Sequence, residues 1–260
     1  MKEIKLNTFL KSQAQDKLYG LSDDIELCLK QTQKNLHVPQ RPARDVEVLD
    51  LFKMPPKSNL DSVDGQMRLI HDLAHIEMQA MELGLRTLTE FPEAPIEFKE
   101  QLIEVILDES RHFKMLLDCL EHHKRPWGSY PVHLSLWFAT SSEDSLLDRI
   151  LIVHRYLEGS GLDAGEKITK KLWGAGQKGL LDIVKVIVDE EVSHVSFGSR
   201  WFRKLCEEQK MDSDHVFAQR MQALHHRLPK RVLKLNRQLR TEAGFTEAEM
   251  NVLEGLNSVI

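Results

Sequence analysis

The chain has 260 residues, of which 42% are hydrophobic and 29% charged, and its net charge is −5 at pH 7. This is the composition of an ordinary soluble globular protein. The length fits one domain with added helices, and the net charge gives no overall reason to expect nucleic acid as a partner. The first residues carry no long apolar run and no cleavage site, and the sequence has no run of about 18 apolar residues and no Cys-x-x-Cys motif. We therefore expect a cytoplasmic protein without a membrane anchor, with Cys28, Cys119 and Cys206 as reduced thiols.

Residues 1–60 are expected to form helices and an extended arm outside the main domain. Residues 1–36 predict two short helices, with Ser22-Asp23-Asp24 capping the second. Residues 37–62 contain four prolines, which predict an extended arm. We expect the basic side chains of this arm, Arg41, Arg44 and Lys53, to be solvated.

The first long helix is predicted over residues 61–90, and its apolar face carries one acid, Glu77. Glu82 is the other candidate acid on this helix, but it breaks by five residues the spacing of a repeat described below, so we favour Glu77. His71 and His75 point away from Glu77 on the helical wheel. They could form a separate metal pair, but we favour satisfied surface histidines or supports for a site.

A second helix is predicted over residues 95–123, after a turn bracketed by Pro92 and Pro95. Glu109 and His112 are three residues apart, so both reach one point from one helix face. Asp108 stands three residues before Arg111 and is expected to be structural. The aromatic link 126–142 is long enough to cross a bundle, and its His133 either reaches the site or is an ordinary loop residue.

A third helix is predicted over residues 142–172 and a fourth over residues 180–210, with a glycine-rich bend between them. The third carries Glu158, and His154 four residues earlier is either an extra ligand or, as we favour, a hydrogen-bond partner. The fourth carries Glu191 and His194 after an apolar run. The remaining residues, 212–260, predict an amphipathic helix and a last short helix near 246–256. The basic segment 220–240 is either a solvated helix face or a contact for an anionic partner such as RNA.

The two halves of residues 61–211 repeat one arrangement. Glu77 precedes Glu109 by 32 residues, Glu158 precedes Glu191 by 33, and the midpoint of each pair falls in a predicted bend. Each half is therefore interpreted as a hairpin that brings a lone Glu and a Glu-x-x-His pair to the same height. Together they supply the ligand set of dimetal carboxylate bundles: Glu77, Glu109, His112, Glu158, Glu191 and His194. The alternative is a metal-free core in which Arg111 or Arg155 neutralises these acids.

Four segments carry a resemblance to the ferritin-like diiron superfamily, and within it to a bacterial ferritin-like family filed as a domain of unknown function. They are Ala74–Ala80, Asp108–Phe113, Leu157–Asp163 and His194–Phe202. The resemblance implies an all-α, ferritin-like four-helix bundle over residues 61–211 with a long crossover between its second and third helices. The N-terminal arm of residues 1–60 precedes this bundle, and C-terminal helices in residues 212–260 pack on it. His154 is not part of the pattern of that family.

A site of this kind is expected to bind two metal ions, with iron favoured and manganese or zinc as alternatives. The predicted function is a non-haem diiron oxidoreductase that activates O2 or peroxide, for example to hydroxylate a small-molecule substrate. The alternative is an iron-handling or oxidant-scavenging protein without an organic substrate, and a third option is a scaffold. No catalytic residue beyond the ligands is assigned. RNA, through residues 220–240, and a second copy of the chain in a homodimer are the macromolecular partners considered.

Overall fold

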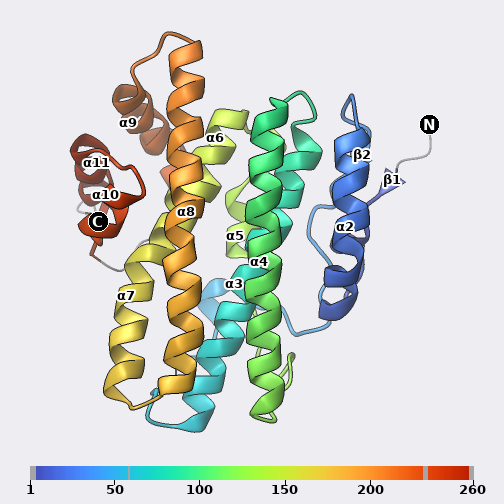
Figure 1. The fold of residues 1–260 in the computed structure, drawn as a ribbon, viewed down its shortest axis with the longest axis vertical. Coiled ribbons are helices and arrows are strands. Elements are labelled where there is room, and N and C mark those ends of the chain that lie inside the picture. Colours follow the sequence, from blue (N-terminus) through green and yellow to red (C-terminus); the bar gives the residue numbers. More distant parts are fainter. Residues whose placement is uncertain (1–3, 58, 231–233, 258–260) are drawn as a thin grey trace. The chain divides into compact units, whose positions relative to one another are not determined.

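The structure is a computed structural model that describes residues 4–57, 59–230 and 234–257. Helices dominate it, and the prediction of an all-α fold is confirmed (Figure 1). Within these ranges the strands are β1 (Ile4–Lys5) and β2 (Leu36–His37), which pair in parallel. The chain forms two compact units, Met1–Trp137 and Phe138–Ile260, and each is described by itself. None of the helices in the described ranges combines the length and the apolar character needed to cross a membrane.

The first unit is built on the hairpin of α3 (Val63–Glu90) and α4 (Ile96–His122). Ser62 caps α3 because its hydroxyl accepts a hydrogen bond from Gly65 N at 3.1 Å. The helix ends where Pro92 and Pro95 follow, so the predicted bend is confirmed. α1 (Asn7–Leu10) and α2 (Ala14–Lys30) precede the hairpin, and α2 packs against α3.

The predicted cap at Ser22-Asp23-Asp24 is wrong because these residues lie inside α2. The Asp24 carboxylate accepts hydrogen bonds from the backbone N–H groups of Asn7 and Thr8, at 3.0 and 2.6 Å, and so caps the start of α1 instead. Asp24 therefore caps the start of a helix, but this helix is α1 rather than the second helix that we expected.

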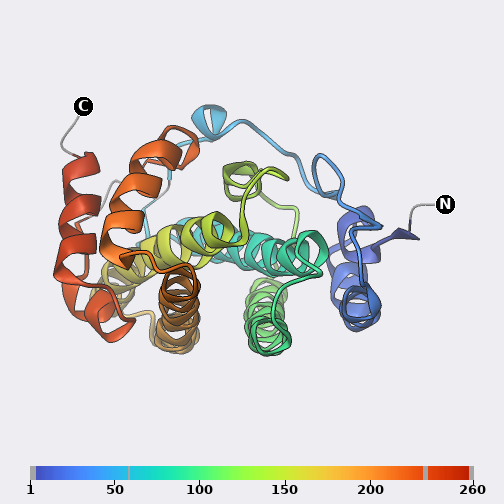
Figure 2. The same cartoon turned by 90° about the horizontal axis from the view of Figure 1, so that it is seen from above.

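The arm between α2 and α3 is extended, as predicted, apart from one 3-10 turn, η1 (Leu51–Lys53). Figure 2 shows this arm in light blue after the end of α2. Ala43 N donates to Phe9 O at 2.8 Å, and Val48 forms a parallel bridge with Val132. These bonds hold the arm against the rest of its unit. The link after α4 carries α5 (Ser135–Ala139), which spans the boundary between the two units.

The second unit is built on a hairpin whose first arm is not one regular helix. It consists of α6 (Leu146–Ile150), a π-helical segment η2 (Leu151–Leu157) and α7 (Glu158–Gly174). The predicted third helix is present, but it begins at residue 146 rather than 142 and contains a π-helical stretch; Ser145 caps its start by accepting from Asp148 N at 3.1 Å. Gly176, with φ of +69°, makes the predicted bend before α8 (Lys178–Glu208).

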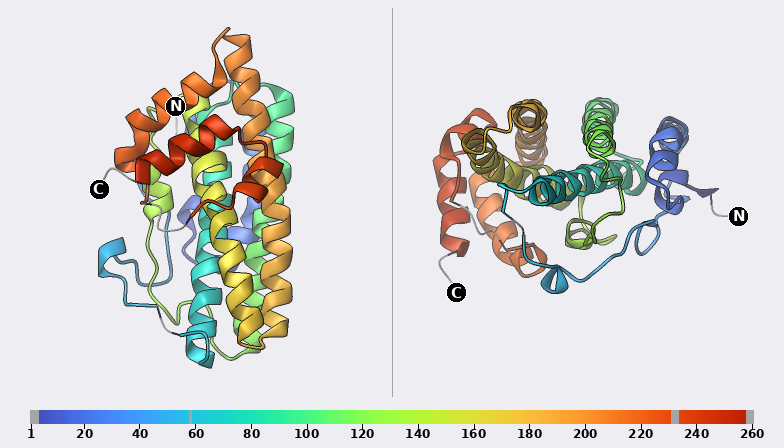
Figure 3. Two further views of the ribbon diagram at one scale, coloured as in Figure 1. Left: turned by 90° about the vertical axis from the view of Figure 1, so that its left-hand side faces the viewer. Right: turned by 90° about the horizontal axis from the view of Figure 1, so that it is seen from below.

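The C-terminal helices pack on this second hairpin (Figure 3). They are α9 (Ser213–Leu224), the 3-10 turn η3 (His225–Arg227), α10 (Arg237–Glu242) and α11 (Glu247–Asn257). Buried ion pairs fasten them: Arg155 of η2 bonds Glu249 of α11 with two contacts of 2.6 Å, and Arg240 bonds Asp163 at 2.9 Å. The division into 1–60, 61–211 and 212–260 stays a prediction.

Candidate metal centre

The hairpin of the first unit brings Glu77 together with Glu109 and His112. His112 Nδ1 lies 3.3 Å from Glu77 Oε2 and 3.8 Å from Glu109 Oε2. One ligand atom from each of the three side chains lies within 4.8 Å of the others, and all three side chains are buried. A cluster of this chemistry and spacing can hold a metal ion.

In the absence of a bound cation, burial and the closeness of the two carboxyl groups shift the pKa values of Glu77 and His112. Burial raises the pKa of the Glu77 carboxyl to about 8, and the nearby charge of Glu109 adds to the shift. Burial alone lowers the pKa of His112, but hydrogen bonding to Glu109 and Glu77 and their negative charges outweigh it and raise that pKa to about 11. Both shifts favour the protonated forms of Glu77 and His112, as expected of acidic groups brought close together away from water.

The second unit brings its own acids and imidazoles together in two pairs. His194 Nδ1 lies 3.5 Å from Glu191 Oε1 on α8, and His154 Nδ1 lies 2.8 Å from Glu158 Oε1. All four side chains are buried. The prediction that His154 is a hydrogen-bond partner of Glu158 is confirmed, and because an ionised carboxylate only accepts, His154 Nδ1–H is the donor.

The π-helical segment positions His154. Its ring packs edge-on against Phe197, with ring centres 5.0 Å apart, and its β-carbon faces Gly198. A β-carbon at position 198 would lie 2.5 Å from that of His154, so only glycine allows this approach. Segments with π-helical hydrogen bonding are frequent at functional sites, and this one ends where Glu158 begins α7.

The comparison with protein families gives a match over residues 3–251 to the family described as "Protein of unknown function (DUF455)". The chain belongs to this family. It is also 27% identical over 204 residues to an uncharacterized protein of Haemophilus influenzae, an alignment that covers 75% of this chain and 70% of the relative. No solved structure matches the chain.

The donors present in this DUF455 chain fit a bound metal. Glu158 Oε2 is buried and has no hydrogen-bond partner among the described residues. Leaving a buried carboxylate oxygen unsatisfied is costly, and metal coordination removes that cost. Carboxylate and imidazole groups suit iron, manganese and zinc alike.

Glu82, the rejected candidate, has a structural role in this DUF455 chain. Its buried carboxylate bonds Lys17 Nζ at 2.9 Å and Arg44 Nη2 at 2.5 Å. It is therefore neutralised on the side of α3 that faces the N-terminal segments, whereas Glu77 faces α4. The expectation that Arg44 is solvated is wrong, because this ion pair buries it.

His71 and His75 are buried, so the surface interpretation of them is wrong. His71 stacks on Trp127 with ring centres 4.6 Å apart, and burial lowers its pKa to about 4. Burial, followed by the charge of Arg44, lowers the pKa of His75 well below its ordinary value. Both rings are therefore neutral parts of a polar core. His133 is half-buried, and its ring centre lies 6.2 Å from that of His75.

The structure does not support a metal-free core in which Arg111 or Arg155 neutralises the buried acids, because both arginines pair with other residues. Arg155 is committed to Glu249, and Arg111 bonds Asp108 at 2.7 Å, with both of these side chains well exposed. The structural role expected of Asp108 is confirmed.

Proposed function

We propose that the hairpins α3–α4 and α7–α8 pack as one ferritin-like four-helix bundle that encloses a dinuclear metal centre. The ligands of this centre would be Glu77, Glu109, His112, Glu158, Glu191 and His194. The observation that carries the proposal is that each unit, taken alone, holds buried carboxylate–imidazole contacts, between the two helices of the hairpin in the first unit and within each arm of the hairpin in the second. Together the two hairpins would supply four carboxylates and two imidazoles, which is the ligand set of dimetal carboxylate bundles.

We further propose that the protein is a non-haem diiron oxidoreductase that uses O2 or peroxide. Two irons, when bound by these residues, would supply the electrons and Lewis acidity that such oxidants require. The chain's own residues would do the rest: the apolar faces around the acids exclude water, and His154 holds Glu158 in one orientation through its Nδ1–H. The alternative of an iron-handling or oxidant-scavenging protein uses the same centre without an organic substrate.

Metal content tests the proposal. Protein loaded anaerobically with Fe(II) and desalted should hold about two irons per chain, the number such a ligand set accepts. Glu109→Ala and Glu191→Ala, one from each hairpin, should each lower that number. Asp108→Ala is the matched control, because Asp108 adjoins Glu109 but pairs with Arg111 at the surface. Equal iron content in all four proteins would reject the centre.

The reaction of the loaded protein with O2 separates the two functions. An oxidoreductase should consume O2 again after each reduction and couple this turnover to the loss of an added organic substrate. A protein that only stores iron or scavenges oxidants should oxidise its iron without such coupling.

Binding of RNA by the basic segment 220–240 stays a prediction. Within this segment, Arg227 pairs with Asp144 and Arg240 pairs with Asp163, and Arg231 lies outside the described residues.

A further inference from the structure

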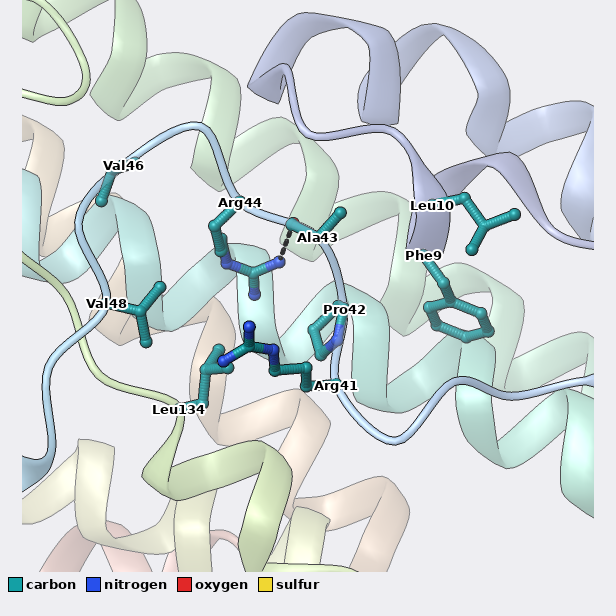
Figure 4. Close-up of a pocket in the computed structure, with 9 residues that line it drawn as sticks. All are labelled: Phe9, Leu10, Arg41, Pro42, Ala43, Arg44, Val46, Val48 and Leu134. Carbon is teal, nitrogen blue, oxygen red and sulfur yellow. Dashed lines mark hydrogen bonds between the residues drawn. The ribbon is translucent and has the colours of Figure 1, made fainter.

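A pocket of about 560 Å³ lies in the first unit, between the N-terminal helices and the arm (Figure 4). This volume falls in the range of roughly 300–1,000 Å³ that is typical of small-molecule sites. Seven of its nine lining residues are of apolar types and two are arginines: the lining residues are Phe9, Leu10, Arg41, Pro42, Ala43, Arg44, Val46, Val48 and Leu134. None of the proposed metal ligands lines it.

The arginines make the pocket positively charged. Figure 4 shows the guanidinium groups of Arg41 and Arg44 turned toward one another inside it. Arg41 is exposed and makes no hydrogen bond or ion pair with any described residue. The guanidinium of Arg41, which has no such partner, can attract an anion that enters this pocket.

The carboxylate beneath Arg44 does not remove this excess of positive charge. Glu82 is shared between Arg44 and Lys17, and the side chains of all three are at most 2% exposed. Glu82 thus pairs with two basic groups at once, and burial lowers the pKa of Lys17. Arg44 donates to Glu82, Ala43 O and His75 Nε2, and so its guanidinium is held rigidly. Arg41, by contrast, keeps all its donors available for a ligand.

The backbone around the pocket is pinned at both ends. Ala43 N donates to Phe9 O at 2.8 Å on one side. On the other side Leu49 N donates to Val132 O at 2.8 Å, and Val132 N donates to Glu47 O at 2.9 Å. The walls are therefore formed before any ligand arrives, which lowers the entropic cost of binding.

We propose that this pocket binds an organic anion, in which a carboxylate or phosphate group contacts Arg41 and an apolar chain covers Leu10, Val46 and Val48. A small inorganic anion would leave the apolar walls wet, and a neutral hydrocarbon would leave Arg41 without a partner. The site is separate from the proposed metal centre and does not depend on it.

Hexanoate and hexyl phosphate are suitable probes, and 1-hexanol is the neutral comparison. Isothermal titration calorimetry of the full chain should show both anions binding more tightly than 1-hexanol. Tighter binding of one anion than the other supports the proposal and identifies the preferred headgroup. Arg41→Ala should weaken both by about tenfold or more, since it removes a charge-assisted hydrogen bond.

Arg200→Ala is the control. Arg200 is exposed on α8 and, among the described residues, bonds only Ser196 Oγ, at 3.0 Å, so the variant removes the same charge away from the pocket and should leave anion binding unchanged. Arg41→Lys should bind with intermediate affinity. The proposal is overturned if neither anion binds, if 1-hexanol binds as tightly as hexanoate, or if Arg41→Ala binds hexanoate as tightly as the wild type. Because Arg41 has no partner to lose, loss of folding does not confuse the result.

Discussion

Substitution of Glu249 by alanine should strongly destabilise the second unit. Both oxygens of Glu249 contact the Arg155 guanidinium at 2.6 Å, and both side chains are 0% exposed. The guanidinium also lies between three aromatic rings, with centroids 5.0, 4.9 and 4.4 Å away. Removal of the carboxylate leaves a buried cation without its counter-charge, at a cost of about 3–5 kcal/mol. For a chain of this size, that corresponds to a midpoint roughly 6–20 °C lower.

The assay is urea unfolding followed by far-ultraviolet circular dichroism, with scanning calorimetry for the midpoint. Glu254→Ala on the same helix is the control, because its ion pair with Arg237 is solvent-exposed and contributes at most about 1 kcal/mol. The double variant Arg155→Met with Glu249→Leu should recover most of the loss, since it removes both charges together. A Glu249→Ala loss no larger than that of Glu254→Ala would refute the reasoning.

Two further predictions concern the site. Without metal, the raised pKa values of Glu77 (from 4.5 to about 8) and His112 (from 6.5 to about 11) mean that between pH 6.5 and 8 the folded state still holds protons that the unfolded state has largely lost. Stability should therefore fall over this window, and Fe(II) should raise the melting midpoint more at pH 8 than at pH 6.5; an equal increase would contradict this. Gly198→Ala should cost about 1–3 kcal/mol because the new methyl group meets His154 at 2.5 Å. Gly161→Ala, with nothing within 4 Å, should be neutral or stabilising by up to about 1 kcal/mol, and equal thermal midpoints for the two variants would contradict the packing argument.

The helices and their bends could be predicted from the sequence because their signals are local. The prolines on either side of Glu93 and the paired glycines 174 and 176 interrupt the helical pattern at the two bends. The apolar neighbours of Glu77 and Glu109 likewise indicate burial without reference to distant residues. These signals were sufficient to place the three acidic and imidazole groups of the first hairpin together.

The features that were missed depend on residues far apart in the sequence. The π-helical segment has no local signature: it forms where Gly198 admits His154 and where Arg155 reaches Glu249, 94 residues away. The burial of His71 likewise depends on Trp127, and that of Arg44 on Glu82. A local pattern cannot show which charge will meet its partner across such distances.

The location of bound iron tests the central claim most directly. Crystals of the full chain loaded with Fe(II) should give two anomalous peaks about 3.5–4 Å apart, a spacing typical of dinuclear sites. Side chains of both hairpins, with Glu109 from one and Glu191 from the other, should surround these peaks. A single peak, or iron bound by the residues of one hairpin only, would contradict the account.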